Sequence, residues 1–196
     1  MPIAGPIFGG LLLGQFSAMG FKGTKIAQLA MAIGNGTANY LMSAAIYQGA
    51  GVGTTPGAGV GTGFVQGIVG PAAGANVMAM MTAMGFKGTK IMSMSMAIGN
   101  AFAQYIKMGI VQSSCLGMAI GSGIGKIIVV GPAMGASISG MMMAMGFKGT
   151  KAVQFAMAVG NGLCLTITSM GIVTTIVAGA GYPPTPMSGA DIGKIM

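Results

Sequence analysis

MGFKGTK occurs three times without change, at Met19–Lys25, Met84–Lys90 and Met145–Lys151. A Gly-Pro pair precedes each copy at the same distance, and a block similar to AMAIGNG follows it. The Gly-Pro pairs begin at Gly5, Gly70 and Gly131, and the later blocks span Ala30–Gly36, Ser95–Ala101 and Ala156–Gly162. Three matched blocks in a fixed order indicate a chain built of three repeats.

Each repeat reads as a helical hairpin followed by strands. Proline suits the first turn of a helix, and the first glycine of MGFKGTK suits the position just beyond its C-terminal end. The threonine of the heptapeptide suits the N-cap of a second helix. Beyond that helix, β-branched runs such as Met108–Ser114 and Lys126–Val130 flank a Gly-rich segment. They predict two short strands joined by a Gly-rich loop.

The predicted fold class is α+β, with three tandem repeats of a helical hairpin plus short Gly-linked strands in a closed pseudo-threefold arrangement. The predicted repeats cover residues 1–69, 70–130 and 131–196. Closure is expected because Gly189–Met196 aligns with Gly121–Ile128, whose continuation corresponds to Pro2–Pro6. The last strand should therefore lie beside the N-terminus, as terminal strands do in propellers. An open array would instead need distinct capping repeats.

Charge is scarce in this chain. Charged residues make up 5%, with nine lysines and a single acid, Asp191, while 53% are hydrophobic and the mean hydropathy is +0.81. A soluble monomer needs a charged, mixed surface, so we expect lipid, further copies of the chain or partner proteins to cover this one. The net charge of +8 points to an acidic partner.

Catalytic chemistry is not expected. There is no histidine and only one carboxylate, so neither an acid–base pair nor a triad base can be assembled. Metal-ligand clusters are also lacking, and Cys115 and Cys164 have no metal-site spacing. We expect both cysteines to be buried, inert thiols. The chain is predicted to be no enzyme, with no catalytic residue, no metal and no cofactor.

Three sets of recurring residues are candidates for a functional or structural role. The lysines of the heptapeptides form either a contact for an acidic partner or a solvated turn. Glycine pairs four residues apart let helices approach closely, in a membrane or in a protein core. Asparagines in the second helices form either a polar ring that fixes register, as buried asparagine does in coiled coils, or a helix break. These sets are Lys22, Lys25, Lys87, Lys90, Lys148 and Lys151; Gly5, Gly9, Gly70, Gly74, Gly131 and Gly135; and Asn35, Asn100 and Asn161.

The order of Gly-Pro, helix, MGFKGT, helix, GIV(Q/T), Gly-rich segment and GKIIVV resembles the Gly-rich repeat virion structural proteins of contractile-tailed, T4-like and cyanophage-type bacteriophages. The resemblance spans most of the chain through short motifs. It implies a structural component of the virion, in the tail or at its tip, whose apolar surface is covered by other virion proteins. A homo-oligomer is expected as well, and a virion protein can also contact the host membrane during infection.

Two alternatives stay open. The first is an integral membrane pore or lysis protein built of helical hairpins, because uncharged spans are long and each hairpin loop carries two lysines. Its difficulty is that the first helix of each hairpin is shorter than the ~20 residues that span a bilayer. The second is a basic protein that lines packaged DNA. Nucleic-acid binding would be non-specific only, since nine lysines make a sparse basic face.

Overall fold

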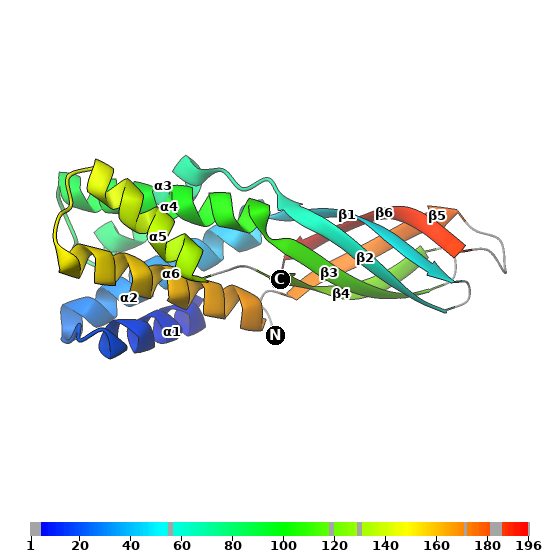
Figure 1. The fold of residues 1–196 in the computed structure, drawn as a ribbon, viewed down its shortest axis with the longest axis horizontal. Helices are drawn as coiled ribbons and strands as arrows, with labels where there is room; N and C mark the ends of the chain where they lie inside the picture. The colour runs from blue at the N-terminus through cyan, green and yellow to red at the C-terminus, as the bar shows by residue number, and fades with distance from the viewer. Residues whose placement is uncertain are drawn as a thin grey trace.

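The computed structural model describes residues 5–54, 57–117, 120–128, 131–170, 172–180 and 186–195. Within the strands, side chains are described at only a few positions. The molecule is elongated, with a helical bundle at one end and a β-barrel at the other (Figure 1). Each third of the chain contributes two helices to the bundle and two strands to the barrel.

The bundle contains a short and a long helix from each third of the chain. The short helices have 14 residues and the long ones 20 or 21, so the long helices extend about 30 Å. They are α1 (Gly5–Ala18), α2 (Thr24–Ala44), α3 (Gly70–Ala83), α4 (Thr89–Met108), α5 (Gly131–Ala144) and α6 (Thr150–Met170). Each helix packs against the one before and the one after it in the chain, and α6 packs against α1. The six helices therefore form a closed ring.

The barrel is made of antiparallel strands in chain order, and the last strand pairs with the first. The strands are β1 (Ile46–Thr54), β2 (Gly57–Gln66), β3 (Ile110–Gly117), β4 (Ile120–Ile128), β5 (Ile172–Ala180) and β6 (Pro186–Ile195). Closure runs through Ile46 opposite Lys194 and Thr54 opposite Pro186. Because each of the described strands pairs with two others, the described part of the barrel has no open edge.

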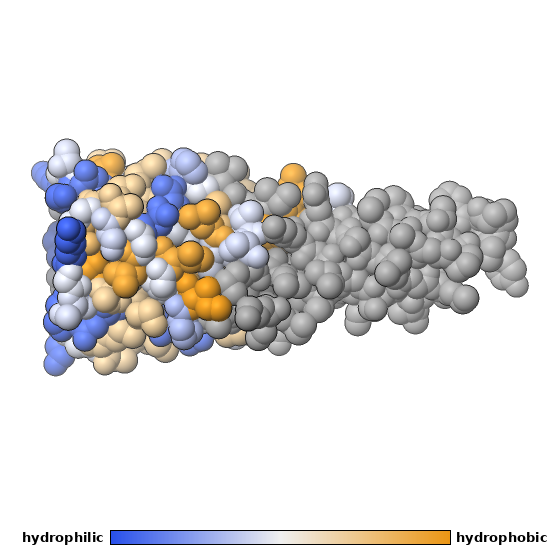
Figure 2. All heavy atoms as spheres, turned by 90° about the horizontal axis from the view of Figure 1, so that it is seen from below, coloured by the Kyte–Doolittle hydropathy of each residue, from blue (hydrophilic) through white to orange (hydrophobic). Residues whose placement is uncertain are grey.

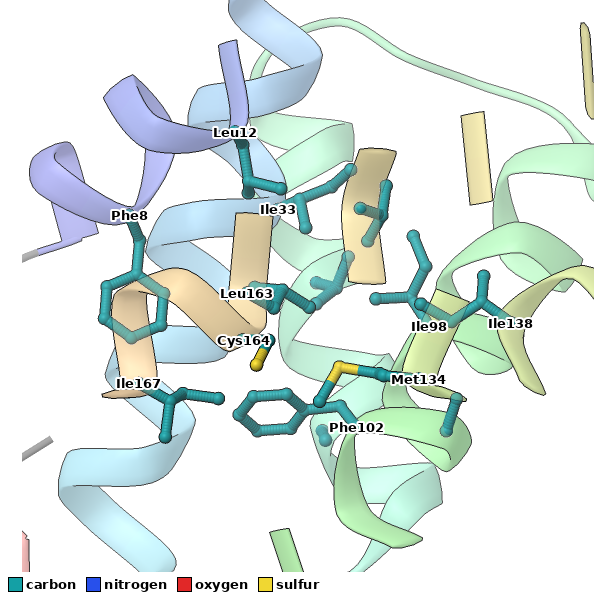
Figure 3. Close-up of a cluster of buried hydrophobic side chains, with 14 of the residues drawn as sticks. Phe8, Leu12, Ile33, Ile98, Phe102, Met134, Ile138, Leu163, Cys164 and Ile167 are labelled. Carbon is teal, nitrogen blue, oxygen red and sulfur yellow. The ribbon is translucent and has the colours of Figure 1, made fainter. Parts of the chain in front are cut away.

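Apolar side chains from all six helices fill the centre of the bundle. Phe8 and Leu12 of α1, Ile98 of α4 and Ile138 of α5 are 0% exposed and lie in one cluster (Figure 3). Several long side chains that meet there come from residues far apart in the sequence. Burial of this kind stabilises the fold by about 25 cal/mol per Å² of apolar surface. The core therefore joins the three parts of the chain into one folding unit.

The predicted α+β fold class is wrong. Among the residues whose side chains the structure describes, 79% are helical and 6% lie in strands. The chain is mostly a helical assembly, and its strands are not short elements joined by Gly-rich linkers. The strands have 8 to 10 residues and contain the glycines themselves, for example in β2. Glycine is disfavoured in strands, and here continuous pairing to two neighbours overrides that preference.

Two further details differ from the sequence-based expectation. The N-caps of α2 and α4 are Gly23 and Gly88, both at φ 111°, so Thr24 and Thr89 are the first helical residues rather than caps. The expected contact between Pro2–Gly5 and Gly193–Met196 falls partly outside the described residues. What the structure describes is closure of the barrel by pairing of β6 with β1 and β5.

Candidate functional site

The three heptapeptide turns lie together at the end of the bundle farthest from the barrel (Figure 1). In the second turn, Gly85 has φ 83° and its N–H donates to the Thr82 carbonyl at 3.0 Å. The Phe86 N–H donates to the Met81 carbonyl at 3.0 Å. These two bonds form a Schellman motif, which requires a residue with positive φ and so favours glycine. The predicted C-cap role of this glycine is confirmed.

The first and third turns have the same hydrogen bonds. The Phe21 N–H donates to the Phe16 carbonyl at 2.9 Å, and the Phe147 N–H to the Met142 carbonyl at 3.0 Å. The glycine preceding each phenylalanine again has positive φ, 80° at Gly20. The identical heptapeptides thus produce identical turns. The lysines that follow each phenylalanine are carried at equivalent positions.

The second lysine of each heptapeptide lies over an aromatic ring of another turn. The Lys25 ammonium is 5.5 Å from the centre of the Phe86 ring. Lys90 lies 5.0 Å from the Phe147 ring, and Lys151 lies 5.3 Å from the Phe21 ring. Each turn therefore contacts the next, and the third contacts the first. Such cation–π contacts are worth about 0.5–1 kcal/mol each at exposed sites, and here they link the three turns in a closed circuit.

The first lysine of each heptapeptide has a different environment. Lys22, Lys87 and Lys148 are exposed. Within the part of the chain whose side chains are described, no hydrogen bond, ion pair or ring contact holds their ammonium groups. Figure 2 shows hydrophilic residues gathered at this end of the bundle. The turns thus form a basic face, which we call the lysine end, made of Lys22, Lys25, Lys87, Lys90, Lys148 and Lys151.

No carboxylate side chain neutralises the lysine end. The only acidic residue in the sequence, Asp191, belongs to β6 in the barrel. Charges on neighbouring lysines repel one another, and salt at physiological concentration screens that repulsion beyond about 8 Å. An acidic partner would remove the repulsion as well as add attraction. The lysine end is therefore the part of the described surface best suited to bind anions.

The recurring glycine pairs bring the two helices of each hairpin into close contact. A Cβ atom added at Gly9 would lie 2.9 Å from the Met31 Cα, and one added at Gly34 would lie 2.7 Å from the Gly9 Cα. The same arrangement joins Gly74 to Gly99 and Gly135 to Gly160. Glycines of the first helix thus face a glycine of the second. These glycines lie where the two helices of each hairpin cross.

The asparagines contact their own hairpins rather than forming a described ring. A Cβ at Gly5 would meet Asn35, one at Gly70 would meet Asn100, and one at Gly131 would meet Asn161. Each asparagine therefore faces the first glycine of the neighbouring short helix, which leaves room for its side chain. The alternative of a helix break is wrong, because α2, α4 and α6 continue through these residues.

Packing between hairpins is unequal. A Cβ at Gly36 in α2 would lie 2.6 Å from the Val77 Cα in α3, and one at Gly162 in α6 would lie 3.2 Å from the Leu12 Cα in α1. The corresponding residue of α4 is Ala101, which is buried. The backbones of α4 and α5 are also the least closely packed of the six neighbouring helix pairs.

The junction of α6 with α1 has an aromatic cluster. The rings of Phe16 and Phe155 stack with their centres 5.2 Å apart, and Phe21 meets Phe155 edge-on at 6.3 Å. Sequence analysis missed this cluster and the lysine–phenylalanine circuit. The positions equivalent to Phe16 and Phe155 hold methionine or leucine in the other repeats, so repetition gave no signal for the cluster. The order of the hairpins around the ring, which sets the circuit, was also unknown.

An apolar groove lies beside the second turn. It has a volume of about 360 Å³, and its lining includes Met78, Phe86, Ile91 and Met92 together with Lys87. It is open rather than enclosed, so it is a surface depression of the lysine end. Its lining offers hydrophobic contact next to a free ammonium group.

Reactive chemistry finds little support in the described part of the chain. Burial raises the pKa of the Cys164 thiol, although hydrogen bonds with Thr168 and the Gly131 backbone lower it in part. Cys164 is 9% exposed and belongs to the core (Figure 3). A protonated, buried thiol is a poor nucleophile. Among the described residues no group of three His, Cys, Asp or Glu could hold a metal ion, and Cys115 has no described side chain.

Comparisons with known protein families, curated proteins and solved structures gave no match to this chain.

Proposed function

We propose that this chain is a structural component of a bacteriophage particle, placed in the tail or at its tip, with neighbouring subunits covering its apolar flank. The main support for the proposal is the uncharged, apolar surface along the flank of the bundle. Between the lysine end and Lys107, near the far end of α4, the helices bear no charged side chain. Large apolar residues are exposed there, including Leu11 at 38% and Leu165 at 50%.

Exposed apolar patches of this kind mark contact surfaces. Ile7 and Leu11 lie on α1, and Val153 and Leu165 on α6, which is its neighbour in the ring. Figure 2 shows apolar and uncharged residues over one side of the bundle behind its hydrophilic end. An assembly in which copies or other virion proteins pack side by side would bury this flank. The order of motifs that resembles Gly-rich virion proteins supports a phage particle as that assembly.

A membrane pore or lysis protein is the second candidate, and one observation favours it. In the described part of the chain, Thr150–Ser169 of α6 is long and apolar enough to cross a membrane, with a mean hydropathy of 1.3. However, 56% of that segment is buried inside the bundle. A core helix of a bundle has the same composition, so this candidate ranks second.

Fractionation of an infected culture tests both candidates. The chain is followed by mass spectrometry in gradient-purified particles and in carbonate-washed membranes. We expect it to sediment with the particles at a constant ratio to other particle proteins across the gradient. Recovery only in washed membranes would support the pore and contradict the proposal. Recovery in neither fraction would contradict both.

A further inference from the structure

We propose that the two lysines of each turn have different tasks, so that Lys22, Lys87 and Lys148 bind an acidic protein partner while Lys25, Lys90 and Lys151 hold the turns together. This inference rests on the proposed function, because the partner is taken to be another protein of the particle. It names the part of the chain that attaches and the chemistry that recognises it.

The contacts divide the lysines. Each second lysine lies within 5.0 to 5.5 Å of a phenylalanine ring in the next turn. Lys90 also donates to the Met145 carbonyl of that turn at 3.4 Å. A lysine held in this way has its ammonium directed toward its own protein. The first lysines have no such contact among the described residues and remain available to a partner.

The free lysines are held in defined positions. Each follows a phenylalanine whose N–H closes a Schellman motif, as Phe86 does with the Met81 carbonyl. The same phenylalanine is half-buried beneath the lysine of the preceding turn. Backbone and ring are both fixed, so the Cα atoms of the three lysines have a defined spacing at the lysine end. A set with fixed spacing favours a partner that presents carboxylates with matching spacing.

Charge complementarity identifies an acidic partner, and two arguments favour a protein. A membrane surface usually takes up apolar or aromatic side chains next to the lysines, but the turn phenylalanines are engaged in the circuit. Duplex DNA is normally bound by a denser basic surface, and among the described residues of the lysine end only Lys22, Lys87 and Lys148 have ammonium groups without a contact. The groove beside Lys87 adds an apolar contact that a protein side chain can fill.

The test compares three variants in particles produced by infection. The first changes Lys22, Lys87 and Lys148 to glutamine. The second, a matched control, is Lys107→Gln, which removes an exposed lysine outside the lysine end. The amount of chain in gradient-purified particles is measured by mass spectrometry, and far-UV circular dichroism with thermal melting checks that each variant folds.

We expect the first variant to fold with an unchanged melting temperature, while its amount in purified particles falls about tenfold or more. The Lys107→Gln control should be incorporated normally. The third variant changes Lys25, Lys90 and Lys151 to glutamine, and its melting temperature should fall instead. Normal incorporation of the first variant would overturn the inference and leave the proposed function intact. Absence of the unaltered chain from particles would overturn both.

A second measurement tests whether lipid or DNA, rather than a protein, binds the lysine end. The purified unaltered chain and the first variant are mixed with vesicles of phosphatidylcholine and phosphatidylglycerol, and separately with duplex DNA, at physiological salt. We expect no binding that depends on Lys22, Lys87 and Lys148. Vesicle binding that is lost in the first variant would identify lipid as the partner of the lysine end, and DNA binding that is lost in it would identify nucleic acid. Either result would overturn a protein partner.

Discussion

Replacing adjacent glycines of α1 by alanine should have opposite effects on stability. Alanine is favoured over glycine inside a helix by about 1 kcal/mol, so both variants gain that amount. At Gly10 an added Cβ meets nothing within 4 Å, and Gly10→Ala should raise the free energy of unfolding by up to about 1 kcal/mol. At Gly9 the Cβ would lie 2.9 Å from the Met31 Cα, which is a backbone atom and cannot simply rotate away.

Overpacking of this kind costs about 1–3 kcal/mol. After subtracting the helix gain, Gly9→Ala should lower the free energy of unfolding by up to about 2 kcal/mol. Gly34→Ala, on the opposite side of the same crossing, should lower it at least as much, since its Cβ would lie 2.7 Å from the Gly9 Cα.

Urea unfolding followed by far-UV circular dichroism gives these free energies. The three variants are compared with the unaltered chain at equal protein concentration, because self-association would shift the curves. The decisive quantity is the difference between Gly9→Ala and Gly10→Ala, expected at about 1–3 kcal/mol. Equal stabilisation by both substitutions would refute the close packing of α1 against α2.

Three further predictions concern single side chains. Phe155→Ala should lower the free energy of unfolding by about 3–5 kcal/mol, because Phe155 is 7% exposed and stacks on Phe16; a urea curve within error of the unaltered chain would contradict this. Tyr40→Phe removes the oxygen that accepts the Val69 N–H at 2.6 Å, so it should cost about 0.5–1.5 kcal/mol and speed hydrogen exchange at that amide. Burial raises the pKa of the Cys164 thiol above its ordinary 9.0, so iodoacetamide should label it much faster in denaturant than in the folded chain. The thiol loses its proton at a lower pH in the unfolded chain than in the folded chain, so the free energy of unfolding should also fall as the pH rises above 9.0. Rapid labelling of Cys164 in the folded chain would contradict both predictions.

The sequence predicts the hairpins well because their signals are local. The glycine at φ 80–83° and the proline at the start of each short helix act within a few residues. These neighbouring residues were therefore sufficient to predict where the first helix of each hairpin begins and ends. The sequence predicted Thr24 and Thr89 as the N-caps of the second helices, but the preceding glycine is the N-cap in each case.

The lysine end shows why the rest could not be predicted. Identical spacing indicated that the lysines matter and predicted Lys22, Lys87 and Lys148 on one exposed face, but it did not show that the second lysine of each turn contacts another turn. Their separation depends on Lys25 reaching Phe86 across hairpins, which requires knowing how the hairpins follow one another around the ring. Likewise, Asn35 was assigned to a ring or a break because nothing local shows that Gly5 faces it. Contacts between distant residues decide both.

The separation of helices and strands to opposite ends has a mechanical consequence. The chain passes between bundle and barrel five times, because each helical pair is followed by a strand pair from the same third of the chain. A force that pulls the two ends apart is therefore shared by five parallel covalent segments. It cannot extend the molecule without breaking helix packing or strand pairing in several places at once. Tension along the long axis should meet far greater resistance than a sideways force that opens α4 from α5.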